Sequence, residues 1–153
     1  MTDYHASVRW ERAGATYTDN RYRRAHTWTF DEGLEVPASS SPHSVPLPLS
    51  EARAVDPEEA LVAAVSSCHM LWFLSLAAKR GLVVERYEDQ PVGTLGRNAK
   101  GREAITLITL RPRITFGSDV SPSADEISAL HHESHELCCL AHSVTADVRC
   151  EPR

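Results

Sequence analysis

The order of extended and helical segments predicts an α+β fold in one domain over residues 1–153. Short stretches in which apolar and polar residues alternate, typical of half-buried strands, lie on both sides of two segments that carry helix start and stop signals. No internal repeat is present. A chain of 153 residues is long enough to bury about two-thirds of its unfolded surface around one core. Strands and helices are therefore expected to share a single core.

The N-terminal third is expected to hold three short strands. Residues 4–10 alternate between apolar and polar side chains, as in a half-buried strand. A second strand is expected over residues 24–30 and a third over 34–36, with a turn at 31–33 between them. Residues 37–55 are rich in proline and serine, which predicts an ordered surface loop or lid.

The clearest helix signals frame residues 56–80. Asp56 suits the N-cap, Pro57 suits the first helical position, and Gly81 suits the end of the helix. Residues 61–78 contain no Asp, Glu, Lys or Arg, which reaches the length of a membrane-spanning helix. Three serines and a histidine in this stretch favour instead a helix buried in a soluble fold, enclosed by sheet or by a second subunit. No membrane is expected as a partner.

Two longer strands, a second helix and a last strand complete the order. The strands are predicted over residues 83–95 and 103–116, with a turn at 98–101. The pattern Ser-x-x-Glu opens a second helix over residues 123–141 as a capping box. Alternating residues 144–150 then form the final strand.

Charge and cysteine content narrow the function classes. The net charge of −5 and the lack of a Lys/Arg-rich block argue against nucleic acid as a partner. The first five residues lack the basic start and apolar run of a signal peptide, so a cytoplasmic location is expected. In that compartment the four cysteines are expected to be reduced, catalytic or metal-bound rather than structural disulfides.

Cys68 is the candidate nucleophile. A thiol that attacks a peroxide must be a thiolate, and a nearby positive charge lowers its pKa. Cys68 lies about three turns into its helix, too far for the helix dipole to supply this charge, so an arginine from another element is needed. The candidates are Arg21, Arg23 and Arg24. His69 is adjacent, but neighbouring side chains on a helix point in different directions. The alternative, that Cys68 is an inert core residue, stays open.

The second helix carries two adjacent thiols, Cys138 and Cys139. At about 100° per residue, Cys138 lies near the edge of the apolar stripe and Cys139 points to the far side. The helical phase therefore favours Cys138 as the thiol that resolves a sulfenic acid on Cys68. Zinc is a second interpretation, because His131 and His135 are four residues apart and precede Cys138. Solvated or capping histidines are the alternative to that zinc site.

Glu58 and Glu59 open the first helix. Both stabilise the positive end of the helix dipole, and the alternative is that one of them also holds the catalytic arginine. Ten residues of straight helix place Glu58 about 15 Å from Cys68. The two residues therefore share a site only if the helix breaks or a second subunit supplies the carboxylate. A homodimer with shared active sites meets this requirement.

Together these segments resemble the OsmC/Ohr family, the osmotically inducible and organic-hydroperoxide-resistance proteins. Three matching stretches carry the resemblance: Asp56-Pro57-Glu58-Glu59, then Ser67-Cys68, and finally His135-Glu136-Leu137-Cys138. The sequence departs from the family pattern at Cys139, where proline is usual, and in the longer proline- and serine-rich segment at residues 37–55.

The resemblance implies a thiol-dependent peroxidase that reduces organic or fatty-acid hydroperoxides. It implies an intertwined homodimer, with antiparallel sheets wrapped around long central buried helices. Cys68 is then the peroxidatic thiol, Cys138 the resolving thiol and Glu58 the carboxylate that orients an arginine. The resemblance indicates Arg24 as the active-site arginine, because Arg24-Ala25 loosely matches an Arg-Ala…Asp-Gly stretch of the family.

No bound cofactor or metal is implied by the resemblance, and an external dithiol is the expected reductant. Two other classes of function stay open in the same fold. One is a non-enzymatic thiol redox sensor or small-molecule carrier. The other is a structural protein that binds zinc through His131, His135 and Cys138.

Overall fold

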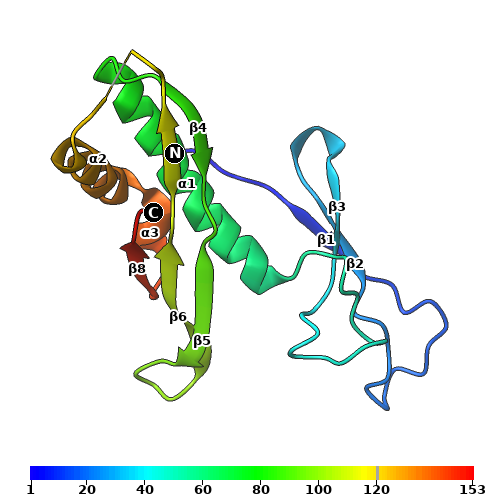
Figure 1. Ribbon diagram of the computed structural model, residues 1–153. Coiled ribbons are helices and arrows are strands. Elements are labelled where there is room, and N and C mark those ends of the chain that lie inside the picture. Colours follow the sequence, from blue (N-terminus) through cyan, green and yellow to red (C-terminus); the bar gives the residue numbers. More distant parts are fainter. Residues whose placement is uncertain (120) are drawn as a thin grey trace. The chain divides into compact units, whose positions relative to one another are not determined.

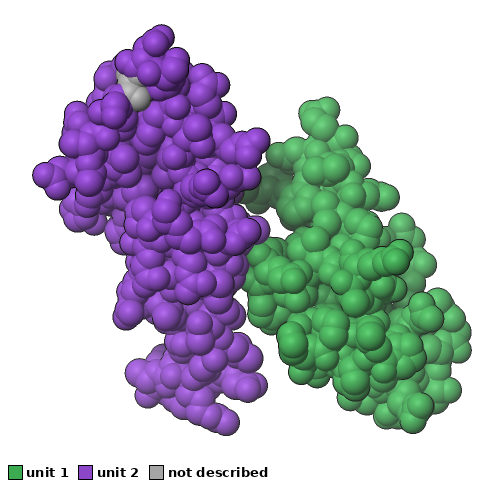
Figure 2. Space-filling view, in the orientation of Figure 1, with its two compact units in different colours: residues 1–60 green, residues 61–153 purple. Residues whose placement is uncertain are grey.

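Strands and helices mix along the chain as an α+β fold, which confirms the predicted fold class. The structure, a computed structural model, describes residues 1–119 and 121–153. It divides into two compact units, residues 1–60 and 61–153, which Figure 2 shows in different colours. One long helix, α1 (Pro57–Lys79), runs from the first unit into the second. That both units form one domain stays a prediction.

The first unit contains a three-stranded antiparallel sheet. Strands β1 (Ser7–Arg9), β2 (His26–Thr29) and β3 (Glu35–Ala38) pair in chain order. The short 3-10 helix η1 (Asp31–Gly33) makes the turn between β2 and β3, and its Gly33 has a φ of 77°, in the left-handed region that glycine tolerates. The first two strands lie inside their predicted ranges, and the third extends further into the proline-rich segment.

Residues 39–55 form the ordered loop that their composition predicts. Ala38 and Val55 make an isolated parallel bridge, and the Ser39 N–H donates to the Val55 carbonyl at 3.0 Å. The hydroxyl of Ser39, a fully buried residue, accepts the Glu51 N–H at 3.0 Å. These bonds close the loop against the end of β3.

Helix α1 begins and ends as predicted. Asp56 Oδ1 accepts the Glu59 N–H at 2.8 Å, and Glu59 Oε2 accepts the Asp56 N–H at 3.4 Å, which caps the first turn reciprocally. At the other end Gly81 has a φ of 72°, the left-handed conformation that commonly terminates a helix. By length and composition alone α1 is able to cross a membrane, a property that core helices of soluble proteins share.

The described residues of the second unit form five strands in two sheets. Strand β4 (Val84–Glu88) pairs antiparallel with β7 (Arg113–Phe116). Strands β5 (Val92–Arg97) and β6 (Glu103–Leu110) form an antiparallel hairpin, and β8 (Asp147–Cys150) adds to β6 in parallel. Figure 1 shows α1 running along these strands.

Each of the two long strands predicted for this unit is divided into two shorter strands. The prediction of two continuous strands was therefore wrong. The breaks fall at Pro91 and Pro112, and proline has no N–H to donate to a strand ladder. Beside the second break, the Arg111 N–H donates to Asp89 Oδ1 at 2.6 Å. Ser66 of α1 also donates its hydroxyl to Asp89, at 2.5 Å. One carboxylate therefore joins both breaks to the helix.

The predicted second helix is also divided. Helix α2 (Ala124–Leu137) starts with the predicted capping box. Cys138, with φ −73° and ψ 99°, is extended and ends it. Helix α3 (Cys139–Ser143) then begins at the next residue. The prediction of one helix to residue 141 was therefore wrong by this single extended residue.

Two apolar clusters hold α1 in the second unit. Phe73 of α1 packs with Leu130 of α2, and both are fully buried. Val65 of α1 packs with Ile108 and Leu110 of β6. Burying side chains of this size contributes about 1.5–3 kcal/mol each. This packing fixes the rotation of α1, and with it the direction of each side chain that α1 presents.

The other side of α1 stays exposed in the single chain. Leu71 is 61% exposed and Leu61 is 36% exposed, although the helix is apolar nearly all round. The expectation that sheet encloses α1 is met on one side only. A second subunit, the other predicted cover, stays a prediction.

Candidate functional site

Cys68 lies beside both thiols of the Cys138–Cys139 pair. The Cys68 and Cys139 sulfurs are 3.9 Å apart. Cys138 is fully buried, with its sulfur 4.0 Å from the Val65 carbonyl oxygen, and it lies near enough to Cys68 to affect its ionisation. Cys68 is partly buried and Cys139 is exposed. Three thiols therefore meet where α1 passes the junction of α2 and α3.

The prediction that Cys139 points away from Cys68 was wrong. It assumed one regular helix through both cysteines, whereas α2 ends at Leu137 and the extended Cys138 resets the direction of the chain. The expectation that Cys138 faces the core is confirmed by its burial. Its role as the resolving thiol stays a prediction, and Cys139 becomes a competitor for that role.

The surroundings of Cys68 within the chain do not make it a ready thiolate. Burial, the largest influence, raises its pKa, and the neighbouring Cys138 raises it further. The Leu140 N–H at the start of α3 acts in the opposite direction and lowers it. The Cys139 pKa is also raised, chiefly by the hydrogen bond with Cys68. Among the described residues, those that influence the Cys68 pKa include no cation, so forming its thiolate would require a positive charge from elsewhere.

Arg24, the predicted source of that charge, lies in the first unit and is held by local contacts. Its guanidinium donates to the Asn20 carbonyl at 3.0 Å, to the Asn20 side-chain oxygen at 2.7 Å and to the Tyr22 carbonyl. It also stacks on the Tyr22 ring at 3.9 Å from the centroid. Cys68 lies in the other unit, so the pairing of Arg24 with Cys68 stays a prediction.

Glu58 is exposed in the first turn of α1. Of the two adjacent carboxylates it is Glu59 that bonds to the backbone of Asp56 and caps the helix. The structural role at the start of the helix, expected of both glutamates, is therefore clear for Glu59, whereas the Glu58 side chain lies at the surface. Its role in orienting an arginine stays a prediction.

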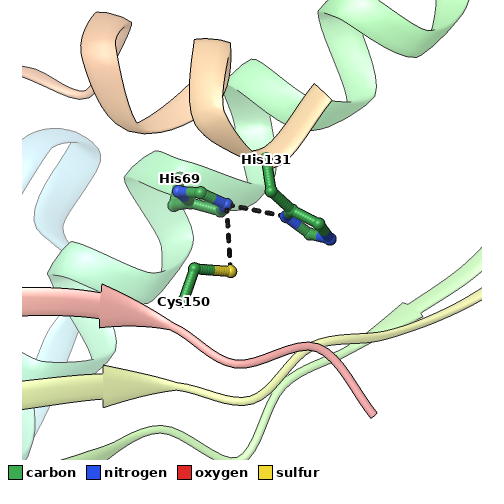
Figure 3. Close-up of side chains that lie close together, drawn as sticks. All are labelled: His69, His131 and Cys150. Atoms are coloured by element: carbon green, nitrogen blue, oxygen red, sulfur yellow. Dashed lines mark hydrogen bonds between the residues drawn. The ribbon is translucent and has the colours of Figure 1, made fainter. Parts of the chain in front are cut away.

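A second cluster of reactive side chains lies in the second unit, on the buried side of α1. His69 Nε2 and His131 Nδ1 are 3.1 Å apart, and Cys150 Sγ is 3.8 Å from His69 Nε2. Figure 3 shows the three side chains converging from α1, α2 and the end of β8. The histidines are 1% and 4% exposed. Cys68 and His69 are adjacent but face different clusters, as expected of neighbours on a helix.

Burial sets the protonation of this cluster. It lowers the pKa of His69 to about 4 and that of His131 to about 4. Burial, followed by the nearby carboxylates of Asp89 and Glu151, raises the pKa of Cys150 to about 12. At neutral pH the cluster therefore holds two neutral imidazoles and a protonated thiol. Neutral imidazole nitrogens carry lone pairs that metal ions accept.

The predicted zinc ligands are not brought together as a set. Among the residues that the structure describes, the group of three metal-ligating side chains within 4.8 Å of one another is His69, His131 and Cys150. His135 instead faces His142, at 6.0 Å between ring centroids. Cys138 is turned toward α1 by the break after α2.

Sequence reasoning missed His69 and Cys150, although both carry a signal. His69 lies four residues from Val65 and four from Phe73, so it shares their buried helix face. Cys150 alternates with Val148 along β8 toward the interior.

A pocket of about 580 Å³ opens beside this cluster. His131 and Cys150 are both part of its wall, together with residues of β7 and α2 such as Phe116 and Ile127. The cluster is therefore buried but reachable from one side, through a pocket whose wall is mostly apolar.

The family model and the most similar structure reported below indicate the same protein family. The family model described as OsmC-like protein matches residues 50–153. An OsmC-like protein of unknown function from Vibrio cholerae O1 biovar eltor is 49% identical, with 100% of both chains covered and a TM-score of 0.98. No match was found among curated proteins.

Two more distant structures share the fold alone. The organic hydroperoxide resistance protein OsmC from Legionella pneumophila is 16% identical over 99% of this chain and 97% of its own, with a TM-score of 0.71. The organic hydroperoxide resistance protein OhrB of Bacillus subtilis is 16% identical over 99% and 98%, with a TM-score of 0.67.

Proposed function

Because the chain belongs to the OsmC-like protein family, we propose that it is a thiol-dependent peroxidase that reduces organic hydroperoxides. Cys68 is the attacking thiol. The observation that carries the proposal is the 3.9 Å separation of the Cys68 and Cys139 sulfurs, beside the buried Cys138. Two structural neighbours named as organic hydroperoxide resistance proteins support the choice of substrate class.

The reaction consumes one hydroperoxide and two thiols. The Cys68 thiolate attacks the distal peroxide oxygen, the O–O bond breaks, and the alcohol leaves after it takes up a proton. Cys68 is then a sulfenic acid. A second thiol displaces its hydroxyl as water and forms a disulfide, which an external dithiol reduces by exchange. No bound cofactor takes part, and a cytoplasmic location, which we also propose, is rich in such dithiols.

Two thiols compete for the second step. The resemblance to the family favours Cys138. Contact and exposure favour Cys139, because its sulfur needs to approach the Cys68 sulfur by about 2 Å to reach bonding distance. Cys139 is exposed to a reductant, whereas Cys138 is buried. We therefore propose Cys139 as the first partner and keep Cys138 as the family-based alternative.

Activation of Cys68 calls for a partner subunit. The raised pKa of its thiol requires a cation, for which we propose Arg24, oriented by Glu58. Helix α1 is continuous between Glu58 and Cys68, a rise of about 15 Å, so these groups meet only across two chains. A homodimer joined along the exposed apolar side of α1 brings them together and covers Leu71, which is 61% exposed.

The test is consumption of cumene hydroperoxide and hydrogen peroxide with dithiothreitol as the reductant. Wild type is expected to prefer the organic peroxide, and Cys68→Ser is expected to lose turnover. Ser128→Ala, at an exposed position of α2 away from the proposed dimer face of α1, is the control and keeps turnover. Undiminished activity of Cys68→Ser contradicts the proposal. One oxidation per chain without turnover supports a redox sensor instead.

Peptide mapping of the oxidised protein identifies the resolving thiol. Cys139→Ser is expected to remove the disulfide and leave Cys68 open to overoxidation, whereas Cys138→Ser is expected to keep a Cys68–Cys139 bond. The reverse result assigns the step to Cys138. The mass of the particle in solution, measured by light scattering, tests the dimer, for which the mass of two chains is expected.

A further inference from the structure

We propose that His69, His131 and Cys150 are three protein ligands of one zinc ion, bound at the floor of the pocket between α2 and β8. The peroxidase proposed above does not use these residues, and the two proposals stand or fall separately. All three side chains lie in the second unit, and they come from three elements far apart in the sequence, as Figure 3 shows.

The spacing of the donor atoms is close to that of a tetrahedral zinc site. Zn–N bonds of about 2.05 Å and a Zn–S bond of about 2.3 Å give edges of about 3.4 Å between two nitrogens and about 3.6 Å between nitrogen and sulfur. The observed separations are 3.1 Å between His69 Nε2 and His131 Nδ1 and 3.8 Å between Cys150 Sγ and His69 Nε2. All donor atoms lie within 4.8 Å of one another. Small side-chain rotations are enough to surround an ion.

The donor chemistry also fits zinc. Imidazole nitrogen and thiolate sulfur are the ligands that zinc prefers. Each imidazole offers the lone pair of one ring nitrogen when its proton sits on the other ring nitrogen, so the proton of the His69–His131 hydrogen bond moves to a far ring nitrogen on binding. Cys150 loses one proton on binding, and the zinc–thiolate bond offsets the cost of that ionisation.

A nearby carboxylate balances the charge. Asp89 lies close enough to the cluster to affect the ionisation of both His69 and Cys150. Its two oxygens are engaged by the Ser66 hydroxyl and the Arg111 N–H. It therefore acts as a fixed negative charge rather than as a ligand. With the Cys150 thiolate it neutralises a divalent cation in a buried setting, where an unbalanced charge is costly.

Access comes from the pocket. His131 and Cys150 are part of the wall of the 580 Å³ pocket, so an ion has a route in. A water molecule from the pocket completes the fourth position. Three protein ligands with one open position is the arrangement of accessible zinc sites, whereas closed structural sites use four protein ligands.

The competing site is the thiol group of Cys68, Cys138 and Cys139, and the experiment separates the two. Reduced wild-type protein is titrated without oxygen with Zn²⁺, and with Co²⁺ as a spectroscopic probe. We expect one ion per chain, tetrahedral cobalt bands and a thiolate-to-cobalt charge-transfer band. X-ray absorption on the zinc form is expected to show one sulfur and two imidazole ligands. Three sulfur ligands, an octahedral spectrum, or no binding overturns the proposal.

Variants locate the ion. Cys150→Ser is expected to abolish the charge-transfer band and to weaken binding by about 100-fold, since loss of a ligand costs at least as much as loss of a group that orients one. Cys139→Ser is the matched control and keeps both the band and the affinity. Binding that survives in Cys150→Ser and disappears in Cys139→Ser contradicts the site. If Cys150→Ser does not fold, the ligand count from wild type still decides.

Discussion

Acid is expected to destabilise the protein through the buried pair His69 and His131. Both are neutral in the folded state, with pKa values near 4, against 6.5 for an exposed histidine. Between these values the unfolded chain binds protons that the folded chain does not. The free energy of unfolding therefore falls as the pH drops from about 6.5 to about 4.

The magnitude follows from the two pKa values. With a folded pKa near 4 and an unfolded pKa of 6.5, one histidine costs about 1.4 kcal/mol at pH 5.5 and about 2.5 kcal/mol at pH 4.5. Each histidine thus contributes a slope of about 1 kcal/mol per pH unit, and the pair about 2. For His69 the charge of Asp89 opposes the downward shift, and that of His135 adds to it.

The assay is urea unfolding between pH 7 and pH 4 at one protein concentration, with a chelator present to keep the cluster free of metal. The double variant His69→Gln/His131→Gln removes both titrations and places an uncharged amide at each position. Carboxylates that do not interact with the pair contribute equally to both proteins. Wild type is therefore expected to lose about 2 kcal/mol more than the variant between pH 5.5 and 4.5. Equal slopes for the two proteins refute the reasoning.

Three further substitutions are expected to destabilise the second unit, each measured by urea unfolding at neutral pH. Gly93→Ala places a methyl group in steric overlap with a methyl group of Val62 in α1, and overpacking of this kind costs about 1–3 kcal/mol; an unchanged midpoint contradicts that contact. Asp89→Ala leaves the Arg111 N–H without its acceptor and costs about 1–3 kcal/mol, whereas Asp89→Asn keeps an acceptor and loses less. Ser123→Ala removes the cap of α2 and costs about 1 kcal/mol; no loss shows that the capping box adds nothing.

The sequence predicted those elements whose limits are set by local chemistry. Asp56 and Gly81 mark the two ends of α1 because capping and left-handed backbone are decided within one turn. The capping box at Ser123 is correct for the same reason. The breaks at Pro91 and Pro112 also had a local signal, since proline cannot donate to a ladder. The long alternating patterns on both sides of these prolines nevertheless favoured unbroken strands.

The candidate site was harder to predict, because it depends on one residue of extended backbone. Nothing in the composition around Cys138 marks a helix end. A regular helix continued through Cys139 therefore predicts the wrong direction for the Cys139 side chain. The pairing of His69 with Cys150 depends on a strand that joins β6 in parallel after two intervening helices. Long-range pairing of this kind has no local pattern.

The unequal exposure of Cys68 and Cys139 would give the disulfide proposed between them a direction of reduction. In the single chain Cys139 is exposed and Cys68 is partly buried, so an incoming dithiol is expected to meet Cys139 first. Attack there makes a mixed disulfide on Cys139 and releases Cys68 as the leaving thiolate. In the proposed cycle Cys68 is therefore freed first, while the reductant is still bound to Cys139 as a mixed disulfide.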